Sequence, residues 1–570
     1  MPKLKYRVST DSIFLDYKKL IKGVGMLIKS KSFRKVKLRV SLVTKHNKSQ
    51  TNHTTTEKHQ LIHEGDTMFL TRLPEEADIV VIGGGIVGCA IARELSRYNT
   101  KVVLVEKNPD LSWGTTKANL GMIHAFVLPI QSLKGKLCLK GNAMYDKLAN
   151  DLNIKFKRPG LLLVALTLKE NFYRLAVYIW AKIHKIPVQW VSKGKLKKME
   201  PNLTPKAKGG ILFPTAGIVS PYEVTLALAE NAITNGVKIA VNTEVIDIIV
   251  ENNQVREVIT NRGVIKTKFV INAAGLYADK IAEMVGEDTF TIRPHAGTIL
   301  IFDKKLQGHY NHIITRIPLK VDPRTKGGGA AITVDGNPIW GPNFRENYDK
   351  ENYSTEKEDI ELVFKKFSEL LPKISKRDII SFFTGLRAVA ELKSKSNKNE
   401  KESDFIIGPT KIKGFINVAG IQSPGLTAAP AIAEMVVEIL RNEGAKLIPK
   451  KTFNPVRPTN PRFSELSLPQ MDEMIKKDAK YGNIVCRCEK VTEAEIVEAI
   501  RKGATTIDGI KFRTRAGMGR CQGSFCLPRI LKILSRELKT TPEKITKRGG
   551  NSYIVCCETK ELRRQNIERN

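Results

Sequence analysis

The chain has 570 residues, which is long enough for two or three domains, and its apolar share of 42% is ordinary for a globular protein. No run of about 18 or more apolar residues occurs, which argues against a membrane-spanning helix. The net charge of +36 admits nucleic acid, an acidic membrane surface or an anionic partner. Because the lysines are scattered and no nucleic-acid motif accompanies them, we expect solvated surface charge and no nucleic-acid partner.

The N-terminal part is the most basic, with 16 Lys and Arg against 5 Asp and Glu in residues 1–72. It lacks the compact apolar core and small-residue cleavage site of a secretory signal. Residues 13–28 fit a short basic amphipathic helix on a membrane surface. A disordered extension, or a start at Met68, are the interpretations that we favour. Nucleic-acid binding by this extension is a third hypothesis, which predicts salt-sensitive retention of DNA.

The first predicted elements form a βαβ unit of about 30 residues. A buried strand at 77–82 leads into the turn G-G-G-I-V-G at 83–88, and a helix follows over 89–97. A second apolar strand at 101–105 ends at Glu106. This order of strand, glycine-rich turn, helix and strand is typical of a nucleotide-binding unit.

Gly83, Gly85 and Gly88 satisfy G-x-G-x-x-G within this unit. The first glycine permits the tight turn, the second lets backbone approach a pyrophosphate, and the third allows close packing of helix on strand. The helix N-terminus favours the phosphate charge. A carboxylate at Glu106 can bind ribose hydroxyls, which disfavours NADP. The pattern predicts a dinucleotide site without separating FAD from NAD.

The rest of the chain alternates between helical and strand patterns. The predicted helices are 135–152, 169–184, 222–235, 357–371 and 428–440. The predicted strands are 161–166, 237–249, 255–260, 269–273 and 415–419, with short strands between 292 and 342. A lysine-rich exposed insertion is expected at 393–404, and prolines indicate a linker at 455–469. We expect an α/β protein that is α+β overall.

Three further segments favour a flavin. Residues 112–124 read S-W-G-T-T-K-A-N-L-G-M-I-H and are rich in small and hydroxyl side chains, as backbone passing close to a flavin would need. Residues 272–279 (N-A-A-G-L-Y-A-D) and 420–427 (G-I-Q-S-P-G-L-T) each place glycine after an apolar strand. They would make a second and a third approach to the cofactor.

With these motifs and F-T-G-L-R at 383–387, residues 76–442 resemble the D-amino-acid-oxidase-like superfamily of FAD-dependent oxidoreductases, nearest the glycerol-3-phosphate dehydrogenases and L-2-hydroxyglutarate oxidases. The resemblance implies a doubly wound FAD-binding domain with an inserted antiparallel substrate-binding sheet. It also implies that a set of residues surrounds FAD, with Val245 binding adenine through its backbone. The set is Gly83, Gly85, Gly88, Glu106, Lys107, Thr115, Thr116, Asn119, Gly121, Val245, Ala274, Gly275, Gly425, Leu426 and Thr427.

Two residues are the candidates for the chemistry. The family's counterpart of His124 lies near the flavin as a base or substrate contact, a role that suits imidazole because its pKa is about 6.5. The alternative is a histidine bonded to backbone in a packed loop. Arg387 would bind a carboxylate or phosphate through two parallel hydrogen bonds, unless it is a surface arginine paired with Glu391. Relatives often have glycine soon after the histidine, whereas Phe126 stands here.

Four of the eight cysteines form two pairs near the C-terminus, Cys486-x-Cys488 and Cys521-x4-Cys526. Tight thiol pairs indicate a metal centre in a reducing cytosol rather than a disulfide framework. Residues 482–535, with a helical stretch at 493–502, resemble the [2Fe–2S] domain of bacterioferritin-associated ferredoxin. Zinc is the main alternative, but structural zinc sites usually use C-x₂₋₄-C pairs.

These observations predict a FAD- and [2Fe–2S]-dependent dehydrogenase that oxidises a small anionic alcohol, foremost sn-glycerol 3-phosphate. Electrons would pass to a quinone or carrier protein. The alternatives are an L-2-hydroxyglutarate or amino-acid/opine dehydrogenase and a non-catalytic electron-transfer subunit. A cytoplasmic location is expected, with peripheral contact at the inner face of the membrane as an extension of it. The expected domains are an extension at 1–72, the oxidoreductase at 73–450, a linker at 451–480, a small helical cysteine domain at 481–540 and a tail at 541–570.

Overall fold

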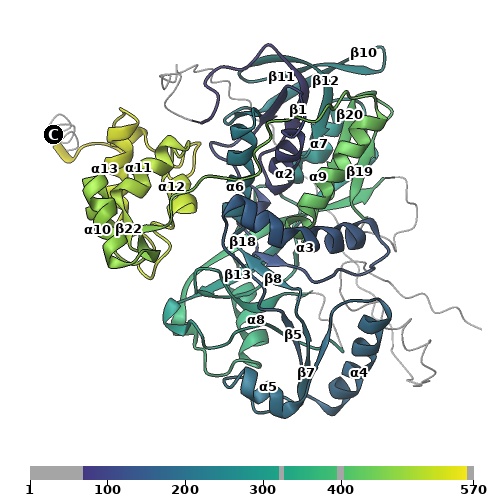
Figure 1. Ribbon diagram of the computed structural model, residues 1–570, viewed down its shortest axis with the longest axis vertical. Helices are drawn as coiled ribbons and strands as arrows, with labels where there is room; N and C mark the ends of the chain where they lie inside the picture. The colour runs from purple at the N-terminus through teal and green to yellow at the C-terminus, as the bar shows by residue number, and fades with distance from the viewer. Residues whose placement is uncertain (1–67, 320–326, 394–403, 561–570) are drawn as a thin grey trace, which may run out of the picture.

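A computed structural model describes residues 68–319, 327–393 and 404–560 (Figure 1). The helix expected at 13–28 and nearly all of the insertion expected at 393–404 lie outside the described residues. Of the expected extension, residues 68–72 are described, and the Leu70 amide donates to the Ile239 carbonyl over 2.8 Å. No helix in the described part of the chain is long and apolar enough to span a bilayer.

The FAD-binding domain is built on an eight-stranded sheet. Its parallel strands run in the order β20 (Phe415–Ala419), β12 (Gly263–Asn272), β1 (Glu76–Ile82), β2 (Val102–Val105) and β9 (Lys238–Ala240). Antiparallel strands extend it at β10 (Val245–Glu251), β11 (Gln254–Thr260) and β19 (Ile406–Pro409). All four residues of β2 are buried, as expected for a parallel strand covered on both faces.

Four helices pack together on one face of this sheet: α2 (Ile86–Leu95), α3 (Leu133–Leu152), α6 (Pro221–Thr234) and α9 (Gly425–Asn442). The opposite face is covered by α7 (Ala278–Glu283) and by the first residues of β13. The single strand expected at 237–249 is two strands, β9 and β10, because Asn242 takes a left-handed conformation (φ 51°) between them.

The second sheet has nine strands. Its longest antiparallel pair, β13 (Phe290–Phe302) and β18 (Ile379–Leu392), packs at one end against the first sheet. Its other strands are β17 (Arg345–Glu346), β16 (Pro338–Gly341), β15 (Gly329–Ile332), β14 (Ile313–Arg316), β5 (Leu161–Ala165), β7 (Gly209–Phe213) and β6 (Gln189–Val191). Every pairing in it is antiparallel except β14 with β5. The expected antiparallel substrate-binding sheet therefore contains one parallel pair.

Helices cover both faces of this sheet. The side chains of Leu161 and Leu163 pack with α4 (Leu168–Ile183), and those of Leu162 and Val164 with α5 (Lys193–Met199) and α8 (Lys357–Ser368). A small sheet of β3 (Met122–Ile123), β8 (Gly217–Val219) and β4 (Phe156–Lys157) lies between the domains and places His124 directly after β3.

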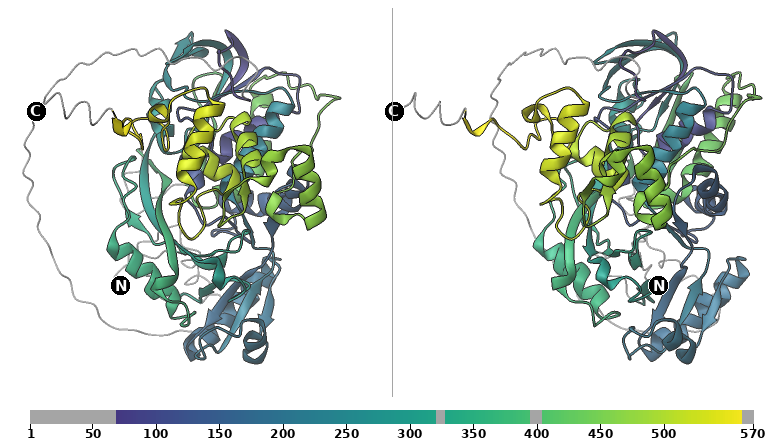
Figure 2. Two further views of the ribbon diagram at one scale, coloured as in Figure 1. Left: turned by 90° about the vertical axis from the view of Figure 1, so that its left-hand side faces the viewer. Right: turned by 60° about the vertical axis from the view of Figure 1, so that its left-hand side comes forward.

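The C-terminal domain packs beside α6 with its own apolar core (Figure 2). Its elements are α10 (Leu468–Lys477), β21 (Ile484–Cys486), β22 (Val491–Thr492), α11 (Glu493–Arg501), α12 (Ile507–Thr514) and α13 (Leu527–Glu537). The segment leading to it is fixed to the FAD-binding domain, since Arg457 pairs with Glu230 over 2.6 Å and Asn235 bonds the Asn454 carbonyl over 2.8 Å.

Candidate functional site

A cavity of about 1270 Å³ lies where the two sheets meet and the C-terminal domain closes over them. Most of the residues expected around a flavin line this cavity, together with both candidate residues for the chemistry. They are Gly83, Gly85, Glu106, Lys107, Thr115, Thr116, Asn119, His124, Val245, Ala274, Gly275, Arg387, Gly425 and Leu426. Segments separated by hundreds of residues therefore converge on one cavity.

Gly88, Gly121 and Thr427 do not line the cavity and support it from behind. A Cβ on Gly88 would collide with the carbonyl of Gly83, so α2 can approach β1 only with glycine there. Gly121 has φ 74° and would likewise meet the Val219 carbonyl. The Thr427 hydroxyl accepts a hydrogen bond of 2.9 Å from the His124 amide.

The backbone around the glycine-rich turn is suited to a dinucleotide. Gly83 has φ 111°, and a Cβ there would meet the Ala273 carbonyl at 2.5 Å, so the turn depends on glycine. Helix α2 begins at the cavity with Gly85 as its N-cap, and the Thr116 hydroxyl accepts from the Ile86 amide over 3.1 Å. The N-terminal dipole of the helix is directed at the site. Glycine at 85 also leaves room for a phosphate against the backbone.

Glu106 lies at the end of β2, where a ribose-binding carboxylate is expected. Its Oε2 accepts from the Gly84 amide over 2.6 Å, and its Oε1 accepts from the Asn108 amide and side chain over 2.9 and 2.6 Å. Burial raises the pKa of Glu106, while these hydrogen bonds favour the ionised form. The carboxylate is held rigidly at the cavity wall.

His124 is fixed by its backbone and presents its ring to the cavity. Its carbonyl accepts from Asn142 Nδ2 over 2.8 Å, while its amide donates to Thr427. Burial lowers the pKa of His124 to about 4, so the ring is neutral at neutral pH. Nδ1 is buried with no hydrogen-bond partner in the described structure. Nδ1 therefore makes no hydrogen bond to the backbone, which was the alternative interpretation of this histidine.

Phe126 forms a wall of the cavity two residues further on. Its ring packs on Phe213 and Trp180, with centroids 4.9 and 5.4 Å apart. The residue that departs from the expected glycine therefore narrows the space beside His124. The sequence analysis missed Lys134, which also lines the cavity and is only 2% exposed. Its position in a helix with many lysines gave no signal.

Arg387 lies on β18, half-buried and at the cavity. Its Nη2 donates to the Asn343 carbonyl over 3.2 Å, and the guanidinium lies 5.3 Å from the Phe344 ring centroid. The alternative pairing with Glu391 does not occur, because Glu391 pairs with Arg293 on the neighbouring strand over 2.7 Å. In a strand the side chains of residues four apart are too far separated for the contact that a helix allows.

The four cysteines of the two sequence pairs gather at one end of the C-terminal domain. Cys488 and Cys521 have their sulfurs 3.7 Å apart, and Cys486 and Cys526 are buried in the same apolar core. Each spatial pair thus takes one cysteine from each sequence pair. Within the described ranges, no three metal-ligating side chains converge on a single point. Two thiol pairs fit a two-iron cluster better than a single tetrahedral zinc.

The C-terminal domain also contributes to the cavity, which the sequence analysis did not foresee. The cavity is lined in part by four residues of the segment 512–522, which contains Cys521. They are Phe512, Arg515, Met518 and Gln522. Phe512 packs on Tyr222 of α6 with ring centroids 5.1 Å apart. A single short segment therefore connects the flavin cavity with the cysteine cluster.

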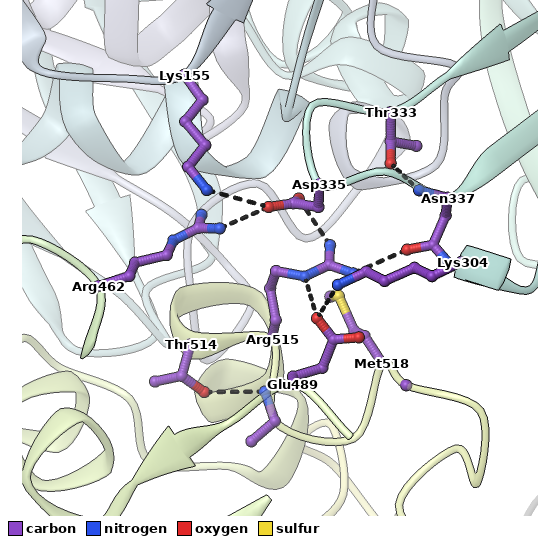
Figure 3. A network of polar contacts seen from close by, with 12 residues as sticks. Lys155, Lys304, Thr333, Asp335, Asn337, Arg462, Glu489, Thr514, Arg515 and Met518 are labelled. Atoms are coloured by element: carbon purple, nitrogen blue, oxygen red, sulfur yellow. Dashed lines mark hydrogen bonds and ion pairs between the residues drawn. The ribbon is translucent and has the colours of Figure 1, made fainter. Parts of the chain in front are cut away.

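A buried ion network holds the C-terminal domain in place (Figure 3). Arg515 pairs with Asp335 over 2.7 Å and with Glu489 over 2.9 Å, and its Nη2 donates to Asn337 over 3.1 Å. Burial opposes ionisation of Asp335, but Arg515 and Arg462 outweigh it and lower the pKa of that carboxyl. Both domains contribute charges that neither could leave buried alone.

Comparison with known proteins gives the family. Residues 78–439 match the family described as FAD dependent oxidoreductase, and residues 484–536 match the BFD-like [2Fe-2S] binding domain. The chain belongs to the FAD-dependent oxidoreductases. The oxidoreductase is 42% identical over 488 residues to the glycerol 3-phosphate dehydrogenase of Caloramator mitchellensis, a match that covers 85% of this chain and 99% of the relative.

Two further relatives bear on the chemistry. The structure of L-alpha-glycerophosphate oxidase from Mycoplasma pneumoniae with FAD bound superposes with a TM-score of 0.61 at 29% identity, covering 68% of this oxidoreductase and all of that chain. The L-2-hydroxyglutarate dehydrogenase of Escherichia coli K12 is 32% identical over 288 residues, which cover 49% of this chain and 67% of the relative. The predicted fold class and the predicted FAD and [2Fe–2S] cofactors are confirmed by these matches.

Proposed function

We propose that this oxidoreductase is a dehydrogenase that oxidises sn-glycerol 3-phosphate to dihydroxyacetone phosphate. The observation that carries the proposal is the single cavity, which brings the flavin-binding motifs, a neutral histidine and an arginine together beneath the cysteine domain. The name of the relative from Caloramator, matched over nearly its whole length, supports the choice of substrate. When bound, FAD accepts the hydride from the substrate carbon.

The residues expected around FAD would hold it in two parts. Backbone at the turn from Gly83 to Gly88 and the start of α2 would bind the pyrophosphate, and Glu106 the ribose hydroxyls. The backbone of Val245 would lie against adenine. The segments around Thr115, Gly275 and Gly425 would surround the flavin ring.

His124 would accept the proton of the substrate hydroxyl as the carbon loses its hydride. A neutral imidazole is needed for this, and burial keeps it neutral. Hydrogen bonds from Asn142 and to Thr427 fix the backbone on both sides of the ring, so the ring position depends on little besides its own rotamer. Both electrons and the proton of the oxidised alcohol are then accounted for.

Arg387 would bind the substrate phosphate. A guanidinium offers two parallel N–H donors to an anion, and the guanidinium of Arg387 already has its plane positioned by Asn343 and Phe344. Lys134 adds a second positive charge to the cavity wall. Two cations suit a phosphate dianion better than a single carboxylate, which favours glycerol phosphate over a simple amino acid.

The electrons would leave through the C-terminal domain. We place the [2Fe–2S] cluster on Cys486, Cys488, Cys521 and Cys526, where it supplies a one-electron carrier. Support comes from the segment from Met518 to Gln522, which contains the expected cluster ligand Cys521 and whose two end residues line the cavity. The final acceptor would be a quinone or a carrier protein.

Visible spectroscopy of the purified protein under anaerobic conditions tests the proposal. Glycerol 3-phosphate should bleach the flavin absorbance and then reduce the cluster, whereas L-2-hydroxyglutarate and amino acids should leave the spectrum unchanged. Bleaching by a hydroxy acid or amino acid alone would replace the substrate assignment. A flavin that no small substrate reduces would point instead to a non-catalytic electron-transfer subunit.

A further inference from the structure

The outer face of α4 carries a continuous stripe of large apolar side chains. Leu168, Phe172 and Ile183 are 71%, 80% and 70% exposed, and Leu175 and Ile179 fill the stripe between them. Their spacing of three and four residues puts all five on one side of the helix. Scattered exposed apolar residues are common on proteins, but a stripe along a whole helix is a sign of an interaction surface.

The inner face of the same helix is already committed to the core. Val177, Trp180 and Ala181 are buried there, and Glu170 near the helix start pairs with Arg316 over 2.7 Å. Helix α4 therefore has two apolar faces, an inner one that is buried in the core and an outer one that is exposed. A helix face with large apolar side chains is normally covered by another element. Nothing among the described residues covers the outer stripe.

Positive charge accompanies the stripe. Residues 166–199 contain eight Lys and Arg and a single acidic residue, the buried Glu170. On the helix, Lys169 and Lys182 fall on opposite sides of the apolar stripe and are exposed. Trp190 of β6 is exposed beside α4 and stacks on Arg174, whose guanidinium lies 3.7 Å from the ring centroid.

We propose that this outer face of α4 seats the protein on an anionic lipid bilayer. Apolar side chains that reach into the interface, flanked by lysines and an exposed tryptophan, match the chemistry of a membrane with negatively charged headgroups. A second copy of the chain fits less well, because a two-fold contact would bring the lysines of one copy against those of the other. Helix α4 lies at the end of the molecule away from the C-terminal domain (Figures 1 and 2).

Co-sedimentation of the full-length holoprotein with vesicles tests the apolar part of the surface. The protein should bind vesicles of phosphatidylcholine and phosphatidylglycerol. The double variant Phe172→Ser/Ile179→Ser should bind these vesicles at least about tenfold more weakly. Leu468→Ser, which removes an equally exposed apolar side chain from α10, should bind like the wild type. Flavin absorbance and turnover with a soluble acceptor should stay unchanged in all three, since these side chains lie outside the cavity.

The charge requirement has its own variant. Lys169→Glu/Lys182→Glu should reduce binding to phosphatidylglycerol vesicles, and high salt should reduce binding of the wild type. Lys532→Glu/Lys539→Glu, an equal change of charge at exposed positions of the C-terminal domain, is the matched control.

Two results would overturn the proposal. One is vesicle binding that is unaffected by the α4 variants, which would assign any binding to another part of the chain. The other is an absence of vesicle binding combined with a wild-type dimer that the Phe172→Ser/Ile179→Ser variant dissolves, which would make the stripe a contact between copies. Neither result depends on the identity of the substrate, so the proposed function stands or falls separately.

Discussion

The backbone amide and carbonyl of His124 are both hydrogen-bonded, whereas Nδ1 of its ring has no hydrogen-bond partner among the described residues. Asn142 and Thr427 reach it from α3 and α9, so two helices of the FAD-binding domain set the position of a residue at the substrate side of the cavity. Such a division is expected of a group that must act on a ligand rather than hold the fold. It also keeps the ring in an environment that disfavours its charged form.

Replacement of His124 by Asn should slow flavin reduction by about 10²–10⁴-fold, because the substrate hydroxyl loses its proton acceptor. Flavin content should not change. Anaerobic stopped-flow reduction by glycerol 3-phosphate measures this rate, and His184→Asn, an exposed histidine at the end of α4 that does not line the cavity, is the control.

The wild-type pH profile should follow from the same environment. A protonated ring cannot accept the substrate proton. Because burial lowers the pKa of His124 from 6.5 to about 4, the rate of flavin reduction should stay constant as the pH falls through 6.5 and should decline only toward pH 4. An acid limb centred near 6.5 would show that the ring is not desolvated in the working enzyme.

Arg387→Met should raise KM for glycerol 3-phosphate by about tenfold or more with a smaller effect on kcat, because a charge-assisted contact to the substrate is lost and the proton acceptor is retained. Arg293→Met removes a guanidinium from the adjacent strand that pairs with Glu391 and does not line the cavity. Equal kinetic effects of the two substitutions would contradict a substrate-binding role for Arg387.

At the scale of elements, the contact of α2 with β1 decides where the cofactor site lies. The helix starts at the cavity because its first turn passes beneath the carbonyl of Gly83, and only a residue without a Cβ fits at position 88. The neighbouring strand β2 then brings Glu106 to the same edge. Three short-range features of one βαβ unit thus place the nucleotide half of the site.

Gly88→Ala should lower FAD occupancy of the purified protein strongly, since a methyl group there forces α2 away from the turn that would bind the pyrophosphate. The cost to stability should be about 1–3 kcal/mol, as for other overpacked positions. The ratio of flavin to protein absorbance measures occupancy. Gly194→Ala, in α5 with open space around the position, should leave occupancy unchanged and not destabilise the fold.

At the scale of the whole molecule, the position of the C-terminal domain is set by ion pairs across the boundary. Arg513, in the last turn of α12 and two residues before Arg515, pairs with Asp110 over 2.8 Å. Both arginines are buried, and their carboxylate partners lie in the FAD-binding and substrate-binding parts. The cysteine domain is therefore docked in one orientation rather than tethered by its linker.

Arg515→Met should uncouple the domains. It leaves Asp335 and Glu489 with fewer cations in a buried setting, at a cost of about 3–5 kcal/mol for a broken buried pair. Flavin reduction by substrate should persist while electron transfer to the cluster slows, and rapid-mixing spectroscopy at flavin and cluster wavelengths separates the two. Arg501→Met, at an exposed position of α11, is the control. Unchanged cluster reduction would show that this docking is dispensable for the relay.

Much of the fold follows from local pattern. The expected helices at 135–152, 169–184 and 222–235 correspond to α3, α4 and α6 within two residues at either end. Strand β18 was not predicted, because its residues from Ile379 to Leu392 have mixed exposure and no clean alternation of apolar and polar side chains. Helix α10 was not predicted either, because it lies within the proline-rich stretch expected as a linker, and none of its residues is buried.

Local patterns were enough to predict the βαβ unit, the flavin motifs and the paired cysteines, because a glycine turn, an acid at a strand end and a thiol spacing each involve only a few neighbouring residues. The three-dimensional arrangement was needed to show that Phe126 lines the cavity, that Glu391 pairs with Arg293, and that Arg515 pairs with Asp335, 180 residues away in the chain. Contacts of that kind depend on how the sheets and domains pack against one another. They are stabilised because the packing brings complementary charges and shapes together in buried positions. No spacing in the chain encodes them.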